Sequence, residues 1–251
     1  MDLGLRERVA IVTGGGRGIG AATALELARE GAAVAVWDRD AASAHETAGQ
    51  IRESGGRALA VLREVADADE VAGGVAEVEQ AFGRIDILVN NAGFSHLGPV
   101  TDMSDAQWAA VLGVHLGGAF HMARAVVPAM KARGYGRIVN MSSLASMGAD
   151  GMACYATVKA GLQGFTRALA VELGAHGITV NAVAPSLIRT ERLKASPVFE
   201  RLSELSLRGQ SIVRDGLPED VANAIAFFAS QRSGFVTGEV LYVTGGIRQL
   251  W

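Results

Sequence analysis

Short apolar runs alternate with longer amphipathic segments along the whole chain, and this alternation restricts the fold more than any other feature. The apolar runs contain no regular alternation with polar residues. Each therefore predicts a strand buried on both faces, as in a parallel sheet covered by helices. These runs lie at residues 9–12, 33–37, 58–62, 85–89, 137–141, 179–183 and 240–243.

The segments between the apolar runs repeat their apolar residues with a helical period. The clearest of them lie at residues 20–29, 41–53, 67–82, 105–130, 153–174 and 218–230. Repeated strand–helix–strand units predict an α/β fold with one doubly wound parallel sheet of about seven strands flanked by helices. In such a sheet the ligand lies at the carboxyl ends of the strands.

The length of 251 residues fits a single α/β domain. Neither a low-complexity linker nor an internal repeat divides the chain. One stretch, at about residues 187–216, has no clear period and is a candidate lid over the ligand site. We therefore expect one domain over residues 1–251.

Charge and composition indicate the class of partner. The formal net charge of −3 gives no electrostatic reason to expect nucleic acid or an anionic membrane. No apolar run approaches the roughly 18 residues of a membrane span, and residues 1–8 lack a signal-peptide core. The single cysteine, Cys154, cannot form an internal disulfide, which fits a reducing compartment. We expect a cytoplasmic protein with a small-molecule partner.

The turn after the first apolar run is rich in glycine and leads into a predicted helix. Glycines allow a tight turn there, and they let backbone N–H groups approach a pyrophosphate at the positive end of the helix. Glycine-rich loops are common, but the position between a strand and a helix favours dinucleotide binding. The turn reads Thr13-Gly14-Gly15-Gly16-Arg17-Gly18-Ile19-Gly20.

Asp38 ends the second predicted strand, 20 residues after Gly18. At this place a carboxylate accepts hydrogen bonds from the adenosine ribose and repels the 2′-phosphate of NADP, so NAD is favoured. Arg17 and Arg39 would attract that phosphate and partly offset the repulsion. The competing interpretation is that both arginines are ordinary solvated side chains, and NADP stays the alternative.

A hydroxyl, a phenol and an ammonium group occur at a spacing that suits proton transfer. Ser142 and Ser143 end the strand predicted at 137–141, and Tyr155 and Lys159 follow four residues apart, on one face of a helix. A free tyrosine has a pKa of about 10, and a nearby ammonium group is expected to lower it. The pair then suits acid–base work on a carbonyl or an alcohol.

With these motifs in place, the chain resembles the short-chain dehydrogenase/reductase family over essentially its whole length. Further matching pieces lie at 90–93, 177–185, 218–222 and 236–238. The resemblance implies a Rossmann-type fold, a homotetramer, and hydride transfer between a nicotinamide cofactor and a secondary alcohol or ketone. Tyr155 would be the acid/base, Lys159 would contact the nicotinamide ribose, and Ser143 would hold the substrate oxygen.

The same resemblance and the adenosine-end arguments give a set of cofactor contacts. Asn91, Ala92 and Gly93 would line the adenosine side, while Ile188 and Thr190 would hold the carboxamide and phosphate end. The full set is Gly14, Arg17, Gly18, Ile19, Gly20, Asp38, Arg39, Glu64, Val65, Asn91, Ala92, Gly93, Tyr155, Lys159, Pro185, Ile188 and Thr190.

The chain departs from the family pattern at His115, where an asparagine is usual. That asparagine is thought to hold a water that links the lysine to solvent. Because an imidazole also donates and accepts hydrogen bonds, we include His115 among the catalytic candidates. The competing interpretation is a packed histidine at a helix bend.

The serine assignment is a second departure. The family usually has 13 residues between serine and tyrosine, which fits Ser142, whereas Ser143 lies 12 residues before Tyr155. Neighbouring strand residues face opposite ways, so the two cannot share a role. The strand register matches the family with Ser143 in the catalytic place, and a one-residue loop deletion is easier than a flipped strand.

Smaller departures and the remaining residues add little. Pro185-Ser186 replaces Pro-Gly, and Glu64-Val65 replaces Asp-Val, where Glu64 could still accept from the adenine amino group. The histidines show no ligand spacing, so we expect no metal site. The terminal Trp251 predicts burial against another subunit.

Two alternatives accompany the main reading. A 3-oxoacyl-carrier-protein reductase is one, although Val171 stands where such relatives tend to have a basic residue for the acidic carrier. A non-catalytic dinucleotide-binding sensor or scaffold is the other; the intact Tyr155 and Lys159 weigh against it.

Overall fold

The computed structural model describes residues 2–247 and contains a seven-stranded, entirely parallel sheet. Its strand order is β3-β2-β1-β4-β5-β6-β7, so the chain winds outward twice from the centre. This confirms the predicted fold class. The strands are β1 (Val9–Thr13), β2 (Ala33–Asp38), β3 (Ala58–Leu62), β4 (Ile87–Asn90), β5 (Gly136–Met141), β6 (Ile178–Pro185) and β7 (Val240–Val243).

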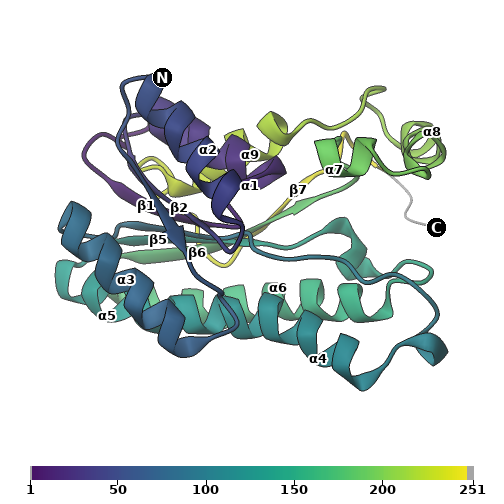
Figure 1. Ribbon diagram of the computed structural model, residues 1–251, viewed down its shortest axis with the longest axis horizontal. Helices are drawn as coiled ribbons and strands as arrows, with labels where there is room; N and C mark the ends of the chain where they lie inside the picture. Colours follow the sequence, from purple (N-terminus) through teal and green to yellow (C-terminus); the bar gives the residue numbers. More distant parts are fainter. Residues whose placement is uncertain (1, 248–251) are drawn as a thin grey trace.

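Helices cover both faces of the sheet (Figure 1). One face carries α1 (Gly18–Arg29), α2 (Ala41–Glu53) and α9 (Pro218–Ala229). The opposite face carries α3 (Ala68–Phe82), α5 (Gly118–Arg133) and α6 (Ala153–Leu173), with α4 (Asp105–Leu112) beyond them.

Strand β1, at the centre of the sheet, is apolar from Val9 to Val12 because it supplies two cores. In β1, Ala10 and Val12 belong to the core beneath α1 and α9, whereas Val9 and Ile11 belong to the core on the opposite face. Successive side chains of a strand point to opposite faces, so both faces of a doubly covered strand favour apolar residues.

The helix expected over 105–130 is interrupted. After α4 the chain makes one π-helical turn, Gly113–Gly117, before α5 begins at Gly118. Such turns insert an extra residue and often mark functional sites. By length and composition alone, the helical segment Asp105–Arg133 would suit a membrane span, but Met122, Val126 and Met130 pack into the core beside the sheet.

The stretch predicted to lack regular structure contains two helices, α7 (Glu191–Lys194) and α8 (Phe199–Gly209). A parallel bridge between Ile188 and Gly216 closes the base of this excursion. Short length explains why α7 gave no periodic signal, since four residues form barely one turn. Figure 1 shows both helices beyond the ends of β6 and β7, at the end of the sheet where α4 also lies.

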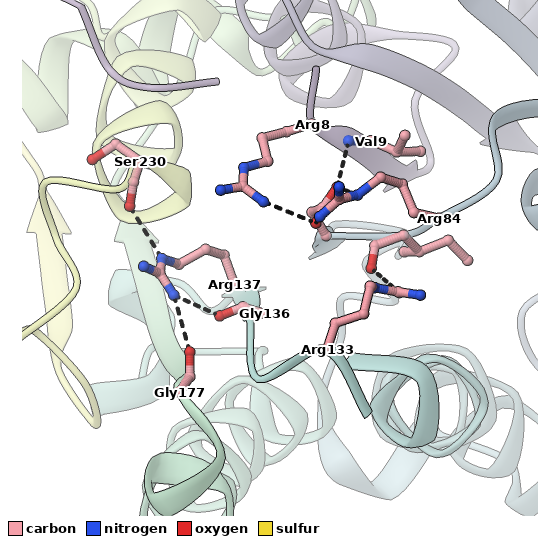
Figure 2. A network of polar contacts seen from close by, with 10 residues as sticks. Arg8, Val9, Arg84, Arg133, Gly136, Arg137, Gly177 and Ser230 are labelled. Atoms are coloured by element: carbon pink, nitrogen blue, oxygen red, sulfur yellow. Dashed lines mark hydrogen bonds and ion pairs between the residues drawn. The ribbon is translucent and has the colours of Figure 1, made fainter. Parts of the chain in front are cut away.

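The amino ends of the strands are held by buried charged side chains (Figure 2). The Asp86 carboxylate, fully buried before β4, accepts from Arg84 Nε at 2.7 Å, from Arg8 at 3.3 Å and from the Val9 amide at 3.0 Å. Arg137 of β5 donates to the carbonyls of Ser230 and Gly177. These contacts join segments far apart in sequence at the edge opposite the predicted ligand site.

Candidate active site

The glycine-rich turn lies at the carboxyl end of β1, and its glycines are sterically required. Gly14 and Gly18 have φ of +61° and +55°, a region that favours glycine. A Cβ at Gly14 would lie 3.0 Å from Ala92 Cα, and one at Gly20 would collide with the Gly14 carbonyl oxygen. The turn therefore packs directly against the segment after β4.

Thr13 and Asn91 fasten these two segments together. The Thr13 hydroxyl oxygen accepts from the amides of Asn91 and Ala92 at 2.9 and 3.0 Å. The Asn91 side-chain amide donates to the carbonyls of Thr13 and Gly14 at 2.8 and 3.1 Å. Sequence reasoning missed Thr13 as a supporting residue, because its role depends on contacts with the chain nearly 80 residues away.

The start of α1 fits the pyrophosphate of a dinucleotide. Arg17 is the N-cap residue, and no side chain caps the first amides of the helix. Four N–H groups at a helix start lack helical partners, and they attract an anion. The space above them is bordered by Thr190, whose Cγ2 would lie 3.2 Å from a Cβ at Gly18. The glycine-rich turn and the uncapped start of α1 are therefore consistent with binding the pyrophosphate of the predicted nicotinamide cofactor.

At the adenosine end, Asp38 closes β2 and faces the glycine-rich turn. Its carboxylate accepts from the amides of Gly16 and Asp40, both at 3.1 Å. Arg17 pairs with Asp40 at 2.6 Å, and Arg39 pairs with Glu64 at 3.4 Å. Both arginines are thus engaged by carboxylates of the protein itself. Hydrogen bonding from the Ser43 amide and the charge of Arg17 lower the pKa of Asp40.

Other predicted cofactor residues surround the same edge of the sheet. Val65 is buried and packs so closely on Gly118 that a Cβ there would lie 2.8 Å from Val65 Cγ2. Pro185 ends β6, and the buried Ile188 follows it. The Thr190 hydroxyl caps α7 by accepting from the Leu193 amide at 3.3 Å. The structure thereby brings residues from five separate segments to one rim.

Ser143, Tyr155 and Lys159 meet at the carboxyl end of β5. Burial raises the pKa of the Tyr155 hydroxyl, and a side-chain hydrogen bond with Ser143 partly offsets that rise. Lys159, 2% exposed, donates from Nζ to the Met141 carbonyl at 2.6 Å and lies 5.4 Å from the centre of the Tyr155 ring. Burial lowers the pKa of Lys159 to about 7.

These pKa directions correct one expectation. The sequence predicted that the Lys159 ammonium would lower the pKa of Tyr155. In the structure desolvation dominates for both groups, because each is enclosed by α6 and the end of β5, and desolvation disfavours whichever form is charged. The phenol is therefore stabilised as phenol, and the lysine loses its proton more readily.

The two serines have different surroundings. Ser142 is 1% exposed, donates to the Lys159 carbonyl at 2.9 Å and accepts from Gln163 at 3.0 Å. Ser143 lies on the other side of the chain, beside Tyr155. The geometry thus favours Ser143 as the residue facing substrate. Gln163, which also donates to Ser146 at 2.7 Å, was missed, although it lies four residues after Lys159 on the same helix.

His115 lies in the π-helical turn and is 3% exposed. Its Nε2 is 2.8 Å from the Phe94 carbonyl oxygen, and its ring meets the Tyr155 ring edge-on with centroids 5.8 Å apart. Burial, and then the charge of Lys159, lower the pKa of His115 to about 3, so the ring is neutral.

Within residues 2–247, no cluster of three or more His, Cys, Asp or Glu side chains is arranged to hold a metal ion.

Comparison with known proteins places this geometry in a family. Residues 14–248 match the family described as "Enoyl-(Acyl carrier protein) reductase". The chain is 43% identical to the short-chain reductase protein NovJ of Streptomyces niveus, over 96% of this chain and 94% of that protein. It is 38% identical to the 3-oxoacyl-[acyl-carrier-protein] reductase FabG of Staphylococcus aureus, over 95% of this chain and 97% of that protein.

Solved structures of proteins described as dehydrogenases share the fold of this chain. A protein from Sinorhizobium meliloti 1021, described as a short-chain alcohol dehydrogenase, superimposes with a TM-score of 0.93 at 36% identity, over 98% of both chains. One from Beutenbergia cavernae, described as an NAD(P)-dependent gluconate 5-dehydrogenase with NADP at low occupancy, gives 0.91 at 37% identity, again over 98% of both. The chain therefore belongs to the short-chain dehydrogenase/reductase family of nicotinamide-dependent oxidoreductases that interconvert secondary alcohols and ketones.

Proposed function

We propose that Ser143, Tyr155 and Lys159 carry out this reaction on a small-molecule secondary alcohol or ketone. The observation that supports it is that the three side chains meet at the end of β5: Ser143 lies close enough to Tyr155 to lower the pKa of its phenol, and the buried Lys159 follows one helical turn further along α6. When bound, the nicotinamide ring supplies the hydride acceptor or donor. In ketone reduction the Tyr155 hydroxyl gives its proton to the substrate oxygen, and in alcohol oxidation the phenolate takes that proton back. Ser143 donates a hydrogen bond to the same oxygen.

We further propose that NAD is preferred to NADP. A 2′-phosphate at the end of β2 would face the Asp38 carboxylate, and Arg17 and Arg39 already neutralise Asp40 and Glu64. With three carboxylates and two guanidinium groups, this corner has an excess of negative charge. The NADP in the Beutenbergia cavernae structure belongs to that protein and leaves the preference here to experiment.

The proposal is tested by following the reduced nicotinamide band with NAD and NADP in parallel, against a panel of secondary alcohols and ketones. We expect higher kcat/KM with NAD, and Asp38→Asn should shift the NADP-to-NAD ratio by about tenfold toward NADP, because one repulsive charge is removed. Asp40→Asn is the comparison variant: it also removes one carboxylate and frees Arg17, so a shift as large as that of Asp38→Asn would show that the total charge of this corner, and not the position of Asp38, sets the preference. A wild-type preference for NADP would contradict the cofactor proposal.

Tyr155→Phe tests the catalytic assignment in the same assay. Loss of the proton donor should lower kcat by about 10²–10⁴-fold, with cofactor binding by fluorescence unchanged. Retained turnover would refute the assignment. A wild-type protein that binds cofactor and turns over nothing in a broad panel would instead favour a sensor or scaffold.

A second candidate substrate is a 3-oxoacyl group on a carrier protein, because relatives named for that activity align over nearly the whole chain. Against it, Val171 is 87% exposed at the place where a basic residue for the acidic carrier is expected. Comparing a carrier-linked 3-oxoacyl thioester with the same acyl group on a short thiol separates the two. Preference for the carrier-linked form would favour the reductase.

We also infer a homotetramer that functions in the cytoplasm. The helix Asp105–Arg133 leaves Trp108 and Phe120 37% and 46% exposed, and the edge strand β7 leaves Leu241 and Tyr242 each 40% exposed. Large exposed apolar side chains and an open sheet edge both favour association. Trp251, predicted to be covered by another subunit, lies outside the described residues.

A further inference from the structure

A chain of directed hydrogen bonds leads from α6 to the end of β4. The Thr166 hydroxyl donates to the Leu162 carbonyl at 2.7 Å, so its oxygen is free to accept from the Asn140 amide at 2.9 Å. The Asn140 oxygen in turn accepts from the Asn90 amide at 2.8 Å. Each donor fixes the direction of the next, so Asn90 has to turn its Oδ1 away from this chain and toward a further donor.

No such donor exists among the described residues. Asn90 Oδ1 and His115 Nδ1 are both buried without a hydrogen-bond partner, in side chains of residues that are 6% and 3% exposed. Both residues line one small cavity of about 10 Å³, together with Thr13, Val65, Ala92 and Val114. The Thr13 hydroxyl is already used, donating to the Val89 carbonyl and accepting two amides. A cavity of this size has room for about one water molecule.

We propose that one buried water bridges Asn90 Oδ1 and His115 Nδ1 in this cavity, and that His115 is thereby a positioning residue that holds the Gly93–Phe94 segment beside Tyr155. The role of His115 rests on the function proposed above for Tyr155, whereas the water site does not.

With this water, Asn90 Oδ1 and His115 Nδ1 each gain a hydrogen-bond partner. Nε2 lies 2.8 Å from the Phe94 carbonyl oxygen and 3.1 Å from the Phe94 amide nitrogen, so the ring can donate to the carbonyl or accept from the amide. If Nε2 carries the proton, the water donates one hydrogen to Nδ1 and the other to Asn90 Oδ1. If Nδ1 carries it, the water accepts from Nδ1 and donates to Asn90 Oδ1, so one water serves both tautomers. Both atoms would otherwise bear the cost of a buried unsatisfied polar group.

The position of the ring explains why its orientation matters. A Cβ on Gly93 would collide with the His115 ring, and the same ring meets the Tyr155 ring edge-on. The ring is therefore wedged between the segment that follows β4 and the phenol. Lys159 donates to the Met141 carbonyl and not to His115, so His115 has no direct hydrogen bond to the lysine. Orientation, and not proton transfer, is the role that these contacts support.

Two side-chain replacements separate the two bonds of His115. The amide of Gln reaches the place of Nε2 and retains the Phe94 contact, whereas the amide of Asn reaches only the place of Nδ1. We expect His115→Phe and His115→Asn to lower kcat/KM about tenfold, mainly through KM, with an unchanged pH profile, and His115→Gln to recover activity to within about threefold of wild type. An Asn variant equal to wild type would show that the Phe94 contact is not needed. A pH profile displaced by any of the three substitutions would show a proton relay. Either result would overturn the positioning role.

A crystal structure of the wild-type protein at high resolution tests the water directly. We expect one ordered water within hydrogen-bond distance of both Asn90 Oδ1 and His115 Nδ1, and its loss or displacement in His115→Phe. A dry cavity in the wild type would overturn the water site. Because this measurement needs no turnover, a water present in a protein that fails the Tyr155 test would refute only the catalytic proposal.

Discussion

At the scale of single residues, the buried Lys159 serves the proposed reaction but lowers the free energy of unfolding, because its ammonium group is enclosed by the fold. Its pKa of about 7 lies below the ordinary value of 10.5, because burial disfavours the charged form. Between those two pH values the unfolded chain binds a proton that the folded chain does not, so the free energy of unfolding rises with pH over this window. Below about pH 7 the cost of burying the ammonium group is fully present.

Lys159→Met should therefore stabilise the protein while removing turnover. We expect the free energy of unfolding to rise by about 2 kcal/mol at pH 7, since the buried charge is lost while the Met141 carbonyl loses its donor. The gain should shrink toward pH 10. Denaturant melts at pH 6, 7, 8.5 and 10 measure both effects, and a gain that grows with pH would contradict the assigned direction of the shift.

At the scale of elements, glycines that look alike in the sequence have opposite roles. Gly20, in the first turn of α1, has no space for a side chain: a Cβ there would meet the Gly14 carbonyl and Asn91 Nδ2. Gly49, within α2, has no atom within 4 Å of such a Cβ. Glycine inside a helix costs about 0.5–1 kcal/mol relative to alanine.

Gly20→Ala is accordingly expected to weaken cofactor binding at least tenfold, because the turn against which the pyrophosphate would bind has to move. Its matched control, Gly49→Ala, should raise the unfolding temperature by a few degrees and leave cofactor affinity unchanged. Isothermal titration and thermal melts of both variants provide the comparison. Equal effects of the two substitutions would mean that the close approach at Gly20 is not what shapes the turn.

At the scale of the whole molecule, Asp86 joins the start of the chain to the middle of the sheet. It is fully buried and balances Arg8 and Arg84, whose side chains are 18% and 36% exposed. Asp86→Asn should lower the free energy of unfolding by roughly 2–4 kcal/mol, since both arginines lose their counter-charge, with a discount for their partial exposure. The kcat of folded enzyme should be unchanged, because Asp86 lies at the edge opposite Tyr155. A fall in kcat with unchanged stability would contradict this division.

Assembly is the second property of the whole molecule. We expect light scattering to give the mass of four chains, and Phe120→Asp together with Leu241→Asp to lower that mass, because each places a charge on an exposed apolar surface. Glu46→Asp, on an exposed position of α2, is the control. A wild-type monomer at micromolar concentration would refute the tetramer.

The amino-acid sequence by itself determined the parallel sheet, the glycine-rich turn after β1 and the shared helical face of Tyr155 and Lys159. These features are local: an apolar run shows burial on both faces, and a four-residue spacing fixes a face. They were sufficient to predict the fold and the core of the candidate site.

Only the tertiary structure decided the features that depend on contacts between distant segments. The burial of the Ser142 hydroxyl depended on α6, whose Lys159 carbonyl accepts its hydrogen bond, and this supports the choice of Ser143 made from the strand register. The partners of Arg17 and Arg39, the direction of the Tyr155 pKa and the π-helical turn at His115 were likewise decided by neighbours far along the chain. Hydrogen bonds and desolvation act through space, and a single sequence carries no record of which distant groups the fold brings together.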